Sequence, residues 1–160
     1  MGIFQIAACL SFVVIAVQDM RERMVQWVLF PLAGLFLALA HYYNTTGWVF
    51  LLSCAVNGLL VTLVVLLLWG YTRYIRKQEF LNTSFGLGDI LFLYAFALGF
   101  PTVTFTVLLS AAIGFALVVW YLLPSLRQSG TVPLAGLMGI FLAATLLLQY
   151  IPPGISLYRF

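Results

Sequence analysis

Charged residues are scarce in this 160-residue chain: they make up 7% of it, and only four of them are acidic. A soluble domain carries about 25% charged residues, so a soluble fold would have too few to cover its surface. Two cysteines and one histidine provide neither a disulfide framework nor a cluster of zinc ligands. Seven basic residues are too few to form a phosphate-binding face. The sequence therefore predicts no metal, no cofactor and no nucleic-acid partner.

Apolar residues, in contrast, make up 64% of the chain and gather in long runs. Most runs are close to the roughly 20 residues that cross a bilayer as a helix. They predict an all-α, polytopic membrane protein with about six transmembrane helices, at residues 2–18, 25–43, 48–72, 89–100, 102–123 and 132–151. Pro31 is expected inside the second span, where neighbouring helices make a kink tolerable. The connections are short, so residues 1–160 are interpreted as a single membrane domain.

The basic residues predict how the chain is oriented in the membrane. If the spans alternate in direction, six of the seven basic residues fall on one side, and only Arg159 falls on the other. The positive-inside rule makes the basic side cytoplasmic and places both termini outside the cytoplasm. The first run lacks a basic N-terminal region, which favours a span over a cleaved signal peptide. We expect a multi-pass protein of the inner (cytoplasmic) membrane, surrounded by lipid.

All four acidic residues then lie on the cytoplasmic side: Asp19, Glu22, Glu79 and Asp89. Asp19 ends the first span and Asp89 opens the fourth, so the two are at one membrane depth and could face each other. A pair of carboxylates can activate water without a metal, because the pair shares one proton and supplies both a base and an acid. Gly86 and Gly88 leave the backbone bare before Asp89, so an extended peptide could approach closely.

Simpler roles are open for the acidic residues. Asp19 could pair with Arg21 or Arg23, and Asp89 could be the N-cap of its helix. Glu22 and Glu79 are interpreted as solvated loop residues.

Other polar or small residues are also given structural roles. His41 is expected to be an interfacial side chain at the outer end of the second span. Asn57 and Thr62 are expected to form hydrogen bonds between helices. Four glycines are expected to allow close helix packing: Gly58, Gly114, Gly136 and Gly139. Cys9 and Cys54 are expected to be ordinary buried thiols.

Three segments resemble one family of membrane proteases. Gly86-Leu87-Gly88-Asp89 has the form GxGD, and Asp19-Met20-Arg21-Glu22-Arg23 ends the first span. Val132-Pro133-Leu134-Ala135-Gly136-Leu137 is similar to the start of the family's last helix. Together they resemble the type IV prepilin peptidases, which are GxGD intramembrane aspartyl proteases, in their short form.

The resemblance implies that the chain is an aspartyl endopeptidase. It would remove the short basic leader from single-span, prepilin-like or pseudopilin-like substrates at the cytoplasmic face. Asp19 and Asp89 would be the catalytic pair, and Gly86 and Gly88 would contact the substrate. The chain has no cysteine-pair region, so the methyltransferase activity of larger members is not expected.

Three residues at two places depart from the family pattern, and three other hypotheses stay open. Gln26-Trp27 stands where the family has Pro-Asn, and Leu91 stands where it has a lysine. The missing lysine motivates the alternative of an inactive relative that serves as an assembly or scaffold component of a pilus or secretion machine.

A small transporter or channel is disfavoured because no acidic residue is expected in mid-membrane. Presenilin-like proteases carry their first aspartate within a span, which fits less well.

Overall fold

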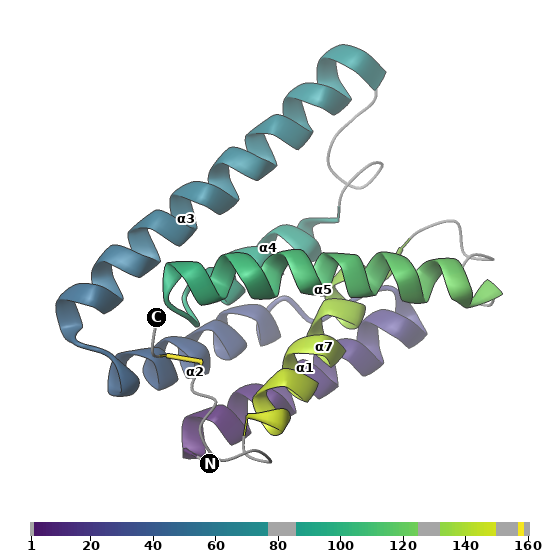
Figure 1. The fold of residues 1–160 in the computed structure, drawn as a ribbon. Helices are drawn as coiled ribbons and strands as arrows, with labels where there is room; N and C mark the ends of the chain where they lie inside the picture. Colours follow the sequence, from purple (N-terminus) through teal and green to yellow (C-terminus); the bar gives the residue numbers. More distant parts are fainter. Residues whose placement is uncertain (1, 77–85, 125–131, 150–156, 159–160) are drawn as a thin grey trace.

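The structure is a computed structural model and describes residues 2–76, 86–124, 132–149 and 157–158. Within these ranges the chain is all-α, as predicted, with six α-helices and no strand. The helices are α1 (Ile3–Glu22), α2 (Leu29–Asn44), α3 (Gly47–Gly70), α4 (Leu87–Ala97), α5 (Thr102–Leu122) and α7 (Leu134–Leu148), shown in Figure 1. A π-helical turn, η1 (Tyr71–Arg76), extends α3.

Three of the helices are long and apolar enough to cross a membrane: α1, α5, and α3 with its extension to Tyr74. The other three are shorter, with 16 residues in α2, 11 in α4 and 15 in α7. At 1.5 Å per residue, α4 is about 16 Å long, roughly half the thickness of a bilayer's hydrocarbon core. A crossing by each of the six predicted spans therefore stays a prediction.

Contacts between helices show in which direction neighbouring helices run. The Phe4 and Tyr43 rings stack 5.5 Å apart, so the start of α1 lies beside the end of α2. Asn57 of α3 reaches the end of α4, and Phe115 of α5 packs on Phe141 of α7. The α1–α2 and α3–α4 pairs run antiparallel. The end of α1, the start of α4 and the start of α7 lie at one end of the bundle, because Asp19 and Asp89 both accept hydrogen bonds from the first turn of α7.

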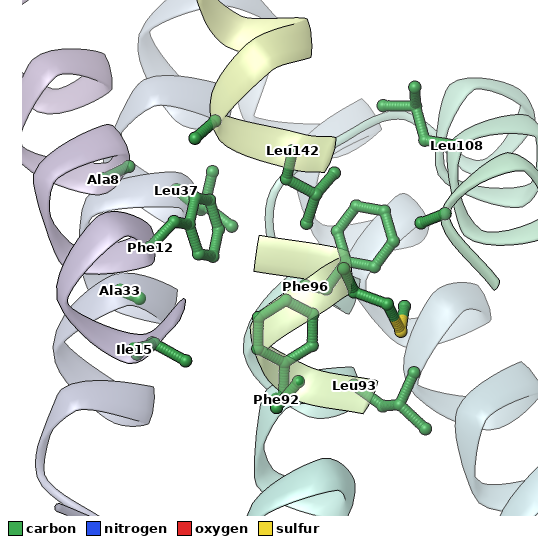
Figure 2. Close-up of a cluster of buried hydrophobic side chains, with 14 of the residues drawn as sticks. Ala8, Phe12, Ile15, Ala33, Leu37, Phe92, Leu93, Phe96, Leu108 and Leu142 are labelled. Carbon is green, nitrogen blue, oxygen red and sulfur yellow. The ribbon is translucent and has the colours of Figure 1, made fainter. Parts of the chain in front are cut away.

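One apolar cluster joins residues from all six helices. Figure 2 shows part of it, with Phe12 and Ile15 of α1, Leu37 of α2, Phe92 of α4 and Leu142 of α7 pointing toward one another. Small residues let these helices approach. A Cβ at Gly34 would lie 3.2 Å from Ala95, and one at Gly139 would lie 3.3 Å from the Phe12 carbonyl oxygen. This tight packing fixes the relative positions of α1, α4 and α7.

The second predicted span was placed too early. Its helix begins at Leu29 rather than near residue 25, so Pro31 is the third residue of α2. A proline in the first turn removes an amide that has no helical acceptor in any case. Pro31 thus lies at the start of α2, where it causes no kink that neighbouring helices would have to tolerate.

α3 differs from the other helices in how little of it is packed. Its buried residues are Ser53, Asn57 and Val61, all in its first two-thirds. From Thr62 to Gly70 no residue of α3 is buried, and Figure 1 shows α3 diverging from α4 and α5 along this stretch.

Candidate functional site

The structure brings Asp19 and Asp89 to the same point, the first turn of α7. The Gly136 backbone amide donates a hydrogen bond to Asp19 Oδ2, at 2.7 Å. The neighbouring amide of Ala135 donates to Asp89 Oδ1, at 3.0 Å. Since consecutive backbone nitrogens are roughly 3 Å apart, these two carboxylate oxygens lie within about 9 Å of each other. Residues 70 positions apart in sequence are thus brought together, and their role as a catalytic pair stays a prediction.

Pro133 explains why two amides are available there. It is the N-cap residue of α7, and its carbonyl oxygen accepts the first helical hydrogen bond, from Leu137 N at 3.0 Å. Amides in the first turn of a helix have no carbonyl partner within the helix and carry the positive end of its dipole. Ala135 and Gly136 therefore offer a site that favours negatively charged acceptors.

The close approach of α1 and α7 requires glycine at position 136. A Cβ built there would lie 3.0 Å from Asp19 Oδ2, 3.1 Å from Asp19 Cβ and 3.4 Å from the Ala16 carbonyl oxygen. A side chain would push Asp19 away from the amide that holds it. The expected packing role is confirmed for Gly136 and Gly139, but a Cβ at Gly58 or Gly114 would have nothing within 4 Å, so the prediction is wrong there. The hydrogen bond from the Gly136 amide to Asp19 adds a second role that the sequence had not indicated.

Asp89 is held by α4 as well as by α7. The N-cap of α4 is Gly86, so Asp89 is the third residue of the helix, and the alternative of Asp89 as the N-cap is wrong. Its carboxylate forms a hydrogen bond with the backbone of Gly86, as the third residue does in a capping box. The start of α4 thus aims this carboxylate at α7.

The two carboxylates also interact through their charges. Both side chains are half-buried, and the charge of each disfavours ionisation of the other. Asp89 lies in the first turn of α4, outside the three helices that could cross the membrane. Burial, followed by the charge of Asp19, raises the pKa of Asp89 to about 6. Arg23 contributes a favourable charge to Asp19, so the alternative of an Asp19–Arg23 interaction is present in part.

The two glycines before Asp89 are both close to other side chains. A Cβ at Gly86 would lie 3.1 Å from Asp89 Oδ2, and one at Gly88 would lie 3.3 Å from Phe30 Cζ. Gly86 therefore gives Asp89 room, while Gly88 allows α4 to pack on the start of α2. Their contact with a substrate stays a prediction.

Of the remaining predicted polar residues, His41 differs most from expectation. It was predicted to be interfacial, but it is fully buried, with Nδ1 3.1 Å from the Leu98 carbonyl oxygen. The Phe50 ring packs edge-on against it at 5.1 Å, because the turn between α2 and α3 folds Phe50 over the histidine. His41 contacts Leu98 just after α4, whereas Asp89 lies in the first turn of α4, so the two lie at opposite ends of that helix.

The helix-bridging roles of Asn57 and Thr62 are confirmed. Asn57 Nδ2 donates to the carbonyl oxygens of Ala97 and Phe100 at 3.0 and 2.9 Å. Thr62 Oγ1 lies 2.9 Å from Tyr94 OH.

Cysteines and the remaining acidic residues complete the comparison. Both cysteines are free, with Cys9 buried and Cys54 half-buried. Glu22 is exposed, while Glu79 lies outside the described residues.

Sequence reasoning missed the part played by the backbone of Ala135 and Gly136. A signal was available: a proline that starts a helix, followed by a glycine within the first turn, indicates free amides that another element can approach closely. That pattern does not identify which side chains approach.

Comparison of the chain with protein-family models, with curated proteins and with solved structures finds no match. Among the described residues, no group of three or more histidine, cysteine or acidic side chains could hold a metal ion.

Proposed function

We propose that this chain is a membrane aspartyl endopeptidase that removes the basic leader of prepilin-like, single-span substrates at the cytoplasmic face. The observation that carries this proposal is the convergence of Asp19 and Asp89, from two different helices, on consecutive amides of α7. The GxGD form of residues 86–89 and the three apolar helices of membrane-crossing length support it further.

The chemistry requires one proton to be shared by the two aspartates. With Asp89 protonated and Asp19 ionised, Asp19 takes a proton from water as the water oxygen attacks the scissile carbonyl carbon. Asp89 donates a hydrogen bond to the carbonyl oxygen and then its proton, giving a tetrahedral diol. Collapse of the diol breaks the C–N bond as Asp19 gives its proton to the leaving amine and Asp89 takes one back from a diol hydroxyl. The raised pKa of Asp89 favours retention of one proton by the pair.

A second candidate follows from the same hydrogen bonds. Carboxylates that accept from the start of α7 stabilise that helix and tie α1 and α4 to it. On this alternative the two aspartates are structural, and the protein is an inactive assembly or scaffold component. Leu91, in place of the family's lysine, is compatible with it.

A cleavage assay with amide variants distinguishes the two candidates. The protein in liposomes would be incubated with a panel of peptides, each with a basic leader, a glycine at its end and an apolar helix. An asparagine side chain at either position would keep an oxygen that accepts from α7, so Asp19→Asn and Asp89→Asn should fold normally. Mass spectrometry of the products reports the cleavage rate and the bond that is cut.

The endopeptidase proposal predicts cleavage by the wild type and a loss of at least about a thousandfold in each variant, as expected for removal of a general acid or base. Wild-type cleavage that survives both exchanges would rule out the aspartyl mechanism. No cleavage by any version, with all three proteins folded, would favour the scaffold alternative.

A further inference from the structure

The residue that ends α1, Arg23, has an unusual backbone conformation. Arg23 is the C-cap of the helix, with φ 55° and ψ 15°, which is the left-handed region. Among the described residues other than glycine, it is the only one with a positive φ. Many helices end on a left-handed residue, but glycine or asparagine usually occupies the position because a Cβ is strained there. Arginine at this position therefore costs stability that glycine would not.

Contacts after Arg23 hold the turn against α1. The backbone amide of Gln26 donates a hydrogen bond to Gln18 Oε1, at 3.1 Å. Val25 packs against the apolar cluster. The family that the sequence resembles has a proline in place of Gln26, and proline has no amide with which to form this hydrogen bond. The connection to α2 thus folds back on the last turn of α1 in a way that depends on this chain's own residues.

The turn places a positive charge beside only one aspartate of the pair. Arg23 is half-buried and follows Asp19 by four residues, one turn of a helix. Its charge favours the ionised form of Asp19. Asp89, in contrast, has the negative charge of Asp19 beside it, and neither α4 nor α7 contains a basic residue. The two carboxyl groups therefore differ in their electrostatic surroundings.

The other titratable groups around the pair leave this difference in place. Arg21, Glu22 and Arg73, which lies just after α3, are exposed, so solvent screens their charges. α7 carries no titratable side chain. On α2 and α4 the remaining titratable residues lie more than one turn further along the helix: His41, Tyr42, Tyr43 and Tyr94.

We propose that Arg23 is a positioning residue that assigns the roles of the pair: its charge keeps Asp19 ionised as the base and leaves the shared proton on Asp89 as the acid. This inference rests on the proposed function and identifies what makes two otherwise equivalent carboxyl groups unequal. It also explains why arginine occupies a position whose backbone favours glycine, since glycine would end the helix equally well but would supply no charge.

NMR can observe the proton of each aspartate directly, because Asp19 and Asp89 are the only aspartates in the chain. Cell-free synthesis with aspartate isotope-labelled at its side-chain carboxyl carbon would give two resonances in detergent micelles. Asp19→Asn and Asp89→Asn assign them. At a pH of about 5, where the pair holds one proton, we expect the resonance of Asp89 to be that of a protonated carboxyl and the resonance of Asp19 that of a carboxylate. The reverse, or a proton shared equally, would overturn the proposal.

Three variants separate the charge of Arg23 from its part in the fold. Arg23→Gly relieves the strained φ, so it should unfold at a temperature no lower than the wild type, while the ratio of protonated Asp89 to protonated Asp19 should fall about threefold, as for loss of one partly exposed ion pair. Arg23→Lys should keep the wild-type ratio. Arg21→Gln, which removes an exposed charge two residues earlier, is the matched control and should also keep it. An unchanged ratio in Arg23→Gly, or an equal change in Arg21→Gln, would contradict the proposal.

The pH dependence of cleavage gives a second measurement. As pH rises, the rate should first increase because Asp19 loses its proton, and in Arg23→Gly this increase should occur about half a pH unit higher, the counterpart of a threefold change in the ratio. An increase at the same pH in both proteins would assign the base to Asp89. If the wild type never cleaves while the resonances respond as expected, the proposed function fails but the charge effect of Arg23 is established. If it cleaves while the resonances do not respond, only the role of Arg23 is refuted.

Discussion

At both ends of the bundle, side chains from other helices bond to backbone groups at a helix terminus, but the side chains differ in kind. At one end, the amides that begin α7 are satisfied by carboxylates from α1 and α4. At the other end, the carbonyl oxygens at and just after the end of α4 are bound by neutral groups. These groups are the side-chain amide of Asn57 and the ring of His41. Both ends tie three helices together through the terminus of one of them.

Only the end that contains Asp19 and Asp89 uses charged side chains to bond these backbone groups. A neutral acceptor such as asparagine would also accept hydrogen bonds from the Ala135 and Gly136 amides, and would lose only the favourable interaction of a negative charge with the start of α7. Two half-buried carboxylates that repel each other are a costlier choice for the fold alone. This excess of charge over structural need favours a chemical role for Asp19 and Asp89.

The largest effect should come from adding charge to the neutral end. In Asn57→Asp, a buried carboxylate would face two carbonyl oxygens instead of donating to them. We expect the protein to lose about 3 kcal/mol or more of stability, measured by thermal unfolding in detergent. Ser110→Ala is the matched control, because Ser110 only bonds to the Thr106 carbonyl oxygen on an exposed face. A small effect of Asn57→Asp would show that the far end tolerates charge and would remove the contrast.

Two glycine-to-alanine exchanges test how closely the helices pack at the end that contains Asp19 and Asp89. Gly136→Ala should destabilise the protein by about 1–3 kcal/mol, because its Cβ meets Asp19, and should slow cleavage. Gly114→Ala is the control, since nothing lies within 4 Å of a Cβ there. That exchange should stabilise helix α5 by about 0.5–1 kcal/mol. Equal effects of the two exchanges would contradict the tight approach of α7 to Asp19.

A smaller effect is expected from pH. Because the pKa of Asp89 is raised to about 6, the folded protein holds its proton more tightly than the unfolded chain. Stability contributed by this proton should therefore fall as pH rises from about 4 to about 6 and then level off. Cleavage should fall as pH rises through about 6, because Asp89 loses the proton it donates. Asp89→Asn should lack this stability change; an unchanged pH profile in that variant would assign the titration to another group.

Much of this arrangement could be predicted from sequence because its signals are local. Apolar runs mark the helices, and the alternation of spans puts Asp19 and Asp89 at one end of the bundle. Helix ends were less accurate: Pro31 was placed mid-helix because an apolar stretch precedes it without being helical.

The remaining features depend on tertiary contacts that periodicity does not encode. The burial of His41 depends on Phe50, which arrives from the next helix. The partners of Asp19 and Asp89 are backbone amides, and any residue other than proline can supply one. Only the close approach at Gly136 singles out this turn, and it requires knowing that α1 and α7 are neighbours.

The central claim is that the acidity of Asp19 and Asp89 serves chemistry and not the fold. Its most direct test is the double variant Asp19→Asn with Asp89→Asn, assayed in one preparation for both thermal unfolding and cleavage of a helix-bearing leader peptide. The account predicts a stability within about 1 kcal/mol of the wild type and no detectable cleavage. A variant that still cleaves, or a wild type that never cleaves while the variant unfolds, would contradict it.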